Sequence, residues 1–149
     1  MVEVPAVALR AHACLSEVDF ASIGTNDLTQ YAMAADRQSA ALAGLTSPWQ
    51  PALLELVRLT AEAGTALGKP VGVCGEAAGD PALAVVLVGL GVTSLSMTPR
   101  ALSDVAATVA SVDLDAARRI AGIALEARSA DAARAAVRAE LPVLVDLGR

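Results

Sequence analysis

Four short apolar segments, each followed by a stretch with helical spacing, constrain the fold of this chain more than any other feature. The segments cover residues 1–4, 18–23, 71–74 and 94–97. Strands that alternate with helices in this order predict right-handed parallel βα units. Two architectures fit the pattern, an open doubly wound sheet and part of a (β/α)8 barrel. The 149 residues are fewer than the roughly 250 of a complete barrel.

Proline and glycine mark where the helices begin and end. Pro5 and Pro99 stand at helix starts, where the missing N–H costs little, and Gly68 ends the longest helix. The predicted helices cover residues 6–15, 52–67, 82–90, the segment after Pro99, 114–128 and 130–141. We therefore divide the chain into an α/β part over residues 1–112 and a helical extension over residues 113–149.

A polar turn follows the second apolar segment. Gly24 permits a sharp exit from the strand, and Thr25, Asn26 and Asp27 come directly after it. One interpretation is a capped strand-to-helix turn, because all three polar residues are good N-caps. The other is a site, because a hydroxyl, an amide and a carboxylate at the carboxyl end of a strand can bind a metal and an anionic ligand.

Three further residues are candidates for a site, and each has a plainer interpretation. Glu3 lies within an apolar segment, as a solvated edge residue or as a carboxylate turned into a site. Arg37 could pair with Asp36 or reach an anion held at the polar turn. Cys74 ends a predicted strand beside a glycine, where it either packs in the core or takes part in chemistry.

The composition disfavours several classes of protein. Phe20, Tyr31 and Trp49 are the only aromatic residues, so the core must consist of Ala, Val and Leu. A net charge of -5 and the scarcity of aromatic residues disfavour nucleic-acid binding, and no apolar run is long enough to span a bilayer. Two distant cysteines without a CxxC motif predict the reducing cytoplasm. We expect His12 to be structural and Cys14 to be a small buried hydrophobe.

Four stretches of the sequence, in the same order, are similar to those of one enzyme family. They are Glu3-Val4-Pro5-Ala6, the Ser-Ile-Gly-Thr-Asn-Asp-Leu-Thr-Gln-Tyr run at 22–31, Ala34-Ala35-Asp36-Arg37, and Gly72-Val73-Cys74-Gly75-Glu76. Together they resemble the phosphoenolpyruvate-protein phosphotransferases, enzyme I of the sugar phosphotransferase system. The resemblance implies that the chain is the second half, about four strands, of a phosphoenolpyruvate-binding (β/α)8 TIM barrel with extra C-terminal helices.

The resemblance also implies a role for each candidate residue. The carboxylates that match Glu3 and Asp27 hold Mg²⁺ in the family. The residues that match Asn26 and Arg37 bind the substrate phosphate, together with Asp27. The residue that matches Cys74 protonates the enolate to give pyruvate. These residue types suit phosphoryl transfer, which depends on positioning and on neutralisation of charge.

The resemblance implies partners as well. The phosphoryl group goes to a protein histidine outside this chain, and His12 does not match it. The phosphocarrier protein HPr would dock on the N-terminal part that this chain lacks, and a homodimer is expected through the barrel.

The differences from the family leave three hypotheses open. The first is a fragment that is active only with its missing half, so we expect no phosphate transfer by the chain alone. The second is a non-catalytic module that binds Mg²⁺ and phosphoenolpyruvate or pairs with another barrel half. The third is a related barrel enzyme with other chemistry, such as an aldolase or lyase, against which the loop around Cys74 argues.

Overall fold

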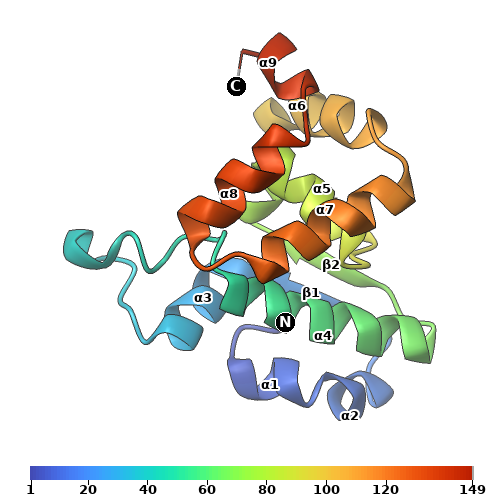
Figure 1. The fold of residues 1–149 in the computed structure, drawn as a ribbon. Helices are drawn as coiled ribbons and strands as arrows, with labels where there is room; N and C mark the ends of the chain where they lie inside the picture. Colours follow the sequence, from blue (N-terminus) through green and yellow to red (C-terminus); the bar gives the residue numbers. More distant parts are fainter. Residues whose placement is uncertain (149) are drawn as a thin grey trace.

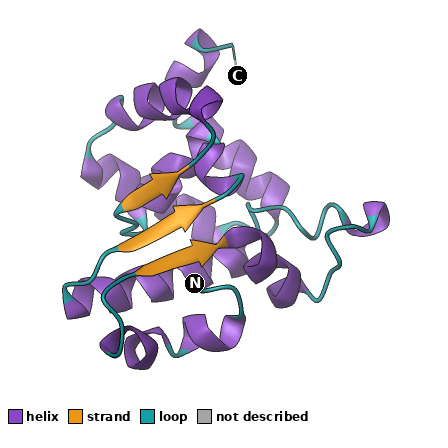
Figure 2. Ribbon diagram, turned by 180° about the vertical axis from the view of Figure 1, so that it is seen from behind, coloured by secondary structure: helices purple, strands orange, loops and turns teal. Residues whose placement is uncertain are grey.

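A three-stranded parallel sheet runs through the molecule in the order β1-β2-β3 (Figures 1 and 2). The computed structural model describes residues 1–148. The strands are β1 (Ala21–Gly24), β2 (Val71–Cys74) and β3 (Ser94–Ser96). Ile23 pairs with Val73, which pairs with Leu95. The prediction of parallel βα units is therefore confirmed.

The prediction of a strand at residues 1–4 is wrong. Val2 forms one isolated parallel bridge with Ile23, through hydrogen bonds to the Ser22 carbonyl (2.8 Å) and from the Gly24 N–H (3.0 Å). The pairing stops there because Pro5, which has no N–H to donate, begins a helix immediately afterwards. The segment therefore lies beside β1 without forming a ladder.

Helices make up most of the remaining structure. They are α1 (Pro5–Leu9), α2 (Ala11–Ser16), α3 (Thr25–Met33), α4 (Pro51–Leu67), α5 (Pro81–Gly89), α6 (Pro99–Ala110), α7 (Leu114–Glu126), α8 (Ala130–Ala139) and α9 (Val143–Asp146), with 3-10 turns η1 (Ala40–Leu42) and η2 (Ala77–Gly79). The predicted helix over residues 6–15 is two helices, because the backbone breaks at Arg10 (φ -113°, ψ 25°). Proline begins α4, α5 and α6, and Gly68 ends α4 with a φ of 66°.

The two faces of the sheet have different surroundings. Ile23, Val71 and Val73 point to one face and are buried against the helices. Ser22 and Gly72 point to the opposite face and are half-buried. Within the part of the chain that the structure describes, no helix covers this second face, as Figure 2 shows with the strands in front of the helices. We call it the open face of the sheet.

The core consists mainly of Ala, Val and Leu side chains, as the composition predicts. Helix α5 lies at its centre, with residues 82–87 all buried, and α7 of the C-terminal extension packs against it. Trp49 is buried, whereas Phe20 and Tyr31 are exposed. Cys14 is exposed, so the prediction that it is buried is wrong: Ala11 and Leu15 form the buried side of α2 instead.

None of the helices in residues 1–148 has the length and apolar character needed to cross a membrane.

Candidate functional site

The polar turn after β1 lies inside helix α3 and does not cap it. The helix begins at Thr25, and Gly24 is its N-cap, with φ -90° and ψ 90°. Asn26 and Asp27 therefore belong to the first turn, where the helix dipole favours a negative charge. Because the expected capping role falls to Gly24, the Asn26 and Asp27 side chains are available for other contacts.

Two hydrogen bonds join the carboxyl ends of β1 and β2, and a third lies within the first turn of α3. The Thr25 hydroxyl donates to the Cys74 carbonyl (3.5 Å), and the Cys74 thiol donates to the Ile23 carbonyl (3.6 Å). The Thr29 hydroxyl donates to the Thr25 carbonyl (2.6 Å), which fixes the first turn of α3. Cys74 is half-buried and lies directly beside the start of α3.

Asn26 lies against the loop that follows Cys74. Its Nδ2 would be 4.0 Å from a Cβ at Gly75, as would the hydroxyl oxygen of Thr25. Gly75 has a φ of 93°, in the left-handed region that favours glycine, and this conformation turns the chain away from the end of β2. The loop after β2 therefore approaches the first turn of α3.

Glu3 lies over the end of β1. A Cβ at Gly24 would be 2.8 Å from the Glu3 Cγ and 2.9 Å from its Oε1, so glycine leaves the space that the Glu3 side chain occupies. Glu3 is half-buried. Its carboxylate therefore lies beside the turn that leads into Asp27.

Arg37 pairs with Asp27 across the end of α3. Its Nη1 lies 3.8 Å from the Asp27 Oδ1, and the two side chains are 49% and 39% exposed. The Arg37 backbone N–H donates to the Gln30 side chain (3.2 Å), which holds the loop against α3. Asp36 instead accepts from the Gln38 N–H (2.9 Å). Arg37 thus reaches the polar turn, and its contact with Asp27 is long and exposed enough to be weak.

All five candidate residues therefore lie around the carboxyl ends of β1 and β2. Glu3 and Asp27 supply oxygen ligands of the kind that Mg²⁺ prefers, and Mg²⁺ is typically held by one or two carboxylates with water and substrate oxygens. Across residues 1–148, no group of three or more His, Cys, Asp or Glu side chains could hold a metal ion by itself. The donor set therefore fits a shared Mg²⁺ site and not a closed protein site.

A cavity of about 1020 Å³ lies next to these residues and is lined by none of the five. Its lining includes Gly75 and Glu76 after β2, Ser96 and Thr98 at the end of β3 and just after it, and Arg134 and Arg138 of α8. From sequence alone, these two arginines alternate with acidic residues in a pattern typical of a solvated helix face. Their spacing of four residues is the signal that places them on one side of α8.

Parallel βα units with polar side chains at the strand ends define a class of α/β ligand-binding domains. The sequence identifies the family within that class: residues 1–114 match the PEP-utilising enzyme, PEP-binding domain, and the chain belongs to this family.

Three relatives extend this result. The chain is 58% identical over 141 residues to a phosphoenolpyruvate-protein phosphotransferase of Streptomyces coelicolor, covering 95% of this chain and 25% of that protein. It is 44% identical over 135 residues to a multiphosphoryl transfer protein of Xanthomonas campestris, covering 91% of this chain and 16% of that protein. It is 50% identical over 98 residues to a phosphoenolpyruvate-protein phosphotransferase of Bacillus subtilis, covering 66% of this chain and 17% of that protein.

The resemblance to phosphoenolpyruvate-protein phosphotransferases is therefore confirmed. The chain spans a quarter or less of the length of these three relatives.

Proposed function

We propose that this chain is part of a phosphoenolpyruvate-protein phosphotransferase and that it binds phosphoenolpyruvate together with Mg²⁺. The observation that carries the proposal is the meeting of Arg37 and Asp27 at the end of β1, beside the Cys74 thiol at the end of β2. Groups suited to binding an anion, holding a metal ion and donating a proton thus lie at one edge of the sheet. The family match and the names of the relatives support the substrate class.

Each residue has a distinct part in the proposed reaction. Arg37 and Asn26 bind the phosphate oxygens, and Glu3 and Asp27 hold Mg²⁺. A Mg²⁺ ion held there would neutralise charge on the transferred phosphate. The phosphoryl group passes to a nitrogen of a histidine outside this chain. The Cys74 thiol, which lies beside the site, then donates its proton to the enolate carbon and gives pyruvate.

The open face of the sheet supports the proposal that the chain is half of a TIM barrel. Side chains on that face are small or polar: Ser22 pairs with Gly72, which pairs with Ser94. A Cβ at Gly72 would be 2.6 Å from the Ser94 hydroxyl oxygen, so the Ser94 side chain occupies the space beside Gly72. The inward faces of barrel strands are filled by side chains from the whole ring, which a second half would supply.

The same surface supports the alternative of a non-catalytic module that pairs with another barrel half. β3 is an edge strand in the sheet described here, and Ser94 and Ser96 are exposed. An edge strand offers unpaired backbone groups to another chain. A homodimer would also cover such a surface. We propose that HPr contacts only segments outside this chain, and that the protein works in the cytoplasm, where its unpaired cysteines stay reduced.

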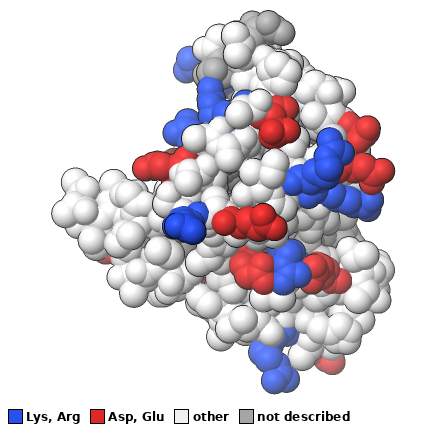
Figure 3. Space-filling model, viewed as in Figure 1, with Lys and Arg blue, Asp and Glu red and all other residues white. Residues whose placement is uncertain are grey.

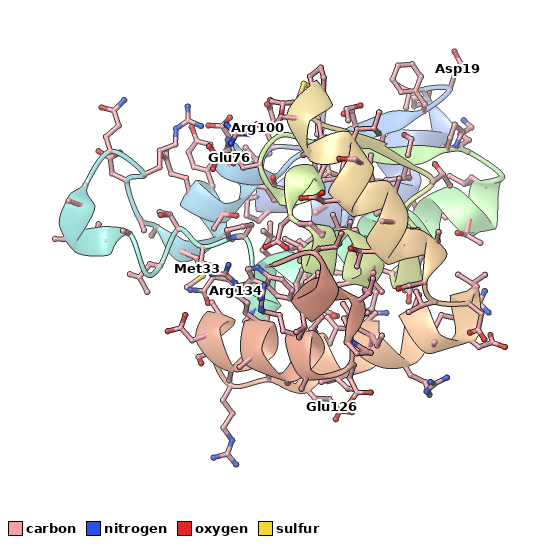
Figure 4. All side chains as sticks on the ribbon, turned by 90° about the horizontal axis from the view of Figure 1, so that it is seen from above. Asp19, Met33, Glu76, Arg100, Glu126 and Arg134 are labelled. Atoms are coloured by element: carbon pink, nitrogen blue, oxygen red, sulfur yellow. The ribbon has the colours of Figure 1, made fainter. Side chains whose placement is uncertain are left out.

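Calorimetry with Mg²⁺ and phosphoenolpyruvate tests the binding proposal. We expect saturable heat with the wild-type chain and a loss of at least tenfold in affinity for Asp27→Ala, because the variant loses a metal ligand and its contact with Arg37. Asp19→Ala is the matched control, since Asp19 is an exposed carboxylate ahead of β1 and lies away from Glu76 in Figure 4. Heat equal to that of buffer for the wild type, or equal binding by both variants, would overturn the proposal.

A further inference from the structure

Two arginines of α8 form one wall of the cavity of about 1020 Å³ beside the candidate site. Ala133 and Val137 are buried and anchor α8 against the core, and Arg134 and Arg138 each follow one of them. Residues four apart lie on the same side of a helix, with Cβ atoms about 5–6 Å apart. Both guanidinium groups are therefore held at the same wall by a helix whose other side is fixed.

These two guanidinium groups differ from several other arginines of the chain. Arg37, Arg58 and Arg118 each have a carboxylate within ion-pair distance. Among the residues that the structure describes, Arg134 and Arg138 have no such partner. In Figure 4, Arg134 points from α8 toward the body of the molecule, on the side where Glu76 lies. Figure 3 shows basic side chains gathered beside α8 and α9.

Other residues of the lining supply polar groups that suit an anion. Ser96, the last residue of β3, and Thr98 line the cavity and are exposed. Gly75 and Gly79 bring backbone close to the cavity from the loop after β2. Met97 adds an apolar surface. The cavity therefore suits a small organic molecule that carries an oxyanion on a partly apolar body.

Two carboxylates line the same cavity and limit its affinity for anions. Asp80 is already engaged: its Oδ2 accepts from the Trp49 indole N–H (3.0 Å), and its Oδ1 accepts from the N–H groups of Ala82 (3.0 Å) and Leu83 (3.2 Å). Glu76 is exposed at the rim. Its negative charge would repel an anionic ligand, so Glu76 would lower the affinity of the cavity for anions without preventing binding.

We propose that Arg134 and Arg138 bind a small organic anion, through phosphate or carboxylate oxygens, in this cavity. Guanidinium groups bind both kinds of oxyanion bidentately, so the two sources share one chemistry. The inference does not rest on the proposed function, because Glu3, Asn26, Asp27, Arg37 and Cys74 all lie outside the cavity lining. The proposal assigns the C-terminal extension a role in binding the anion.

Titration of the full chain in the absence of Mg²⁺ tests the site. Inorganic pyrophosphate is the phosphate probe and citrate is the carboxylate probe, each measured by calorimetry. We expect saturable binding of at least one probe, weakened about tenfold by Arg134→Gln and by Arg138→Gln, because each removes charge-assisted hydrogen bonds. Arg119→Gln is the matched control: it removes an exposed arginine of α7 that does not line the cavity. Glu76→Gln should strengthen binding by several fold.

The outcomes separate this site from the phosphoenolpyruvate site. Asp27→Ala should leave the binding of the probes unchanged. Binding of pyrophosphate alone, or of citrate alone, supports the proposal and shows whether the site prefers phosphate or carboxylate oxygens. Absence of saturable binding by both probes, or equal affinity of Arg134→Gln, Arg138→Gln and Arg119→Gln, would overturn the proposal. Far-UV circular dichroism shows that each variant retains the helices, since the substituted side chains lie at the surface or cavity wall.

Discussion

At the scale of single residues, the space above Gly24 is the most informative feature of the candidate site. A Cβ there would lie 2.8 Å from the Glu3 Cγ, inside the normal contact distance. The backbone of Gly24 is extended (φ -90°, ψ 90°), so an alanine is not strained by its own conformation. The cost of a substitution therefore depends on whether the Glu3 side chain can turn away.

Gly24→Ala should displace the Glu3 carboxylate and leave the fold in place. We expect the free energy of unfolding to fall by only about 1 kcal/mol, because a flexible side chain can adjust. The Mg²⁺-dependent affinity for phosphoenolpyruvate should fall about tenfold, since one proposed metal ligand is displaced. Calorimetry and thermal unfolding measure the two quantities.

Gly44→Ala is the control for this prediction, because a Cβ at Gly44 would have no atom within 4 Å among the described residues. Equal phosphoenolpyruvate affinity in both variants would show that Glu3 contributes nothing to binding.

At the scale of helices and loops, Asp80 joins two loops that carry candidate site residues. It caps α5 just after the loop that follows Cys74. It also accepts from the indole of Trp49, which ends the loop that follows Arg37. Trp49 is 3% exposed, so removal of the carboxylate would take away the hydrogen-bond partner of a buried N–H.

Asp80→Ala should therefore destabilise the chain by about 2–4 kcal/mol, from a lost cap of about 1 kcal/mol and an unsatisfied buried N–H of about 1–3 kcal/mol. Asp113→Ala is the matched control, because Asp113 caps α7 through the Ala116 N–H (2.7 Å). It should cost only about 1 kcal/mol. Urea unfolding followed by circular dichroism compares them, and equal losses would show that the Trp49 contact adds no stability.

Local sequence patterns predict most of the helices and three of the four expected strands in this chain. Helix α4 begins and ends within one residue of its prediction, because Pro51 and Gly68 mark its limits and its apolar residues recur at helical spacing. The segment at residues 1–4 is apolar enough for a strand, but a strand forms only where a neighbour pairs with it, and Pro5 ends that pairing early. Local patterns carry no information about such pairing.

At the scale of the whole molecule, the C-terminal extension is packed onto the α/β part. Residues 117, 120, 121 and 124 of α7 are buried, and α7 lies directly against α5. A Cβ at Gly89, the last residue of α5, would overlap the carbonyl of Ala117. The close approach of these two helices depends on that glycine. Whether residues 1–112 fold as a unit of their own stays a prediction.

Gly89→Ala should force α5 and α7 apart and lower the free energy of unfolding by about 2 kcal/mol, because the new methyl group meets backbone that cannot turn aside. Gly122→Ala is the control on α7, since a Cβ there meets no described atom within 4 Å. It should raise stability by about 0.5–1 kcal/mol, as expected for Gly→Ala in a helix. Midpoints of urea unfolding compare the two, and equal shifts would contradict the close packing of α5 and α7.

The sequence predicts the part of the candidate site that lies at the carboxyl ends of the parallel strands. Asn26 and Asp27 follow one predicted parallel strand and Cys74 ends another, and parallel strands end at one edge. The position of α8 was not predictable, because it results from the packing of α7 and α8 on α5. Arg134 therefore reaches the cavity beside Gly75 through tertiary structure that no local pattern encodes.

The hydrogen bond between Trp49 and Asp80 also makes the intrinsic fluorescence of the chain informative. Trp49 is the one tryptophan in the sequence, so all indole fluorescence of the chain comes from this position. Its N–H is bonded to a carboxylate between the loop after Arg37 and the loop after Cys74. Any ligand that draws these loops together or apart changes the distance and polarity around the indole. The emission wavelength of the unlabelled chain thus reports the state of both loops at once.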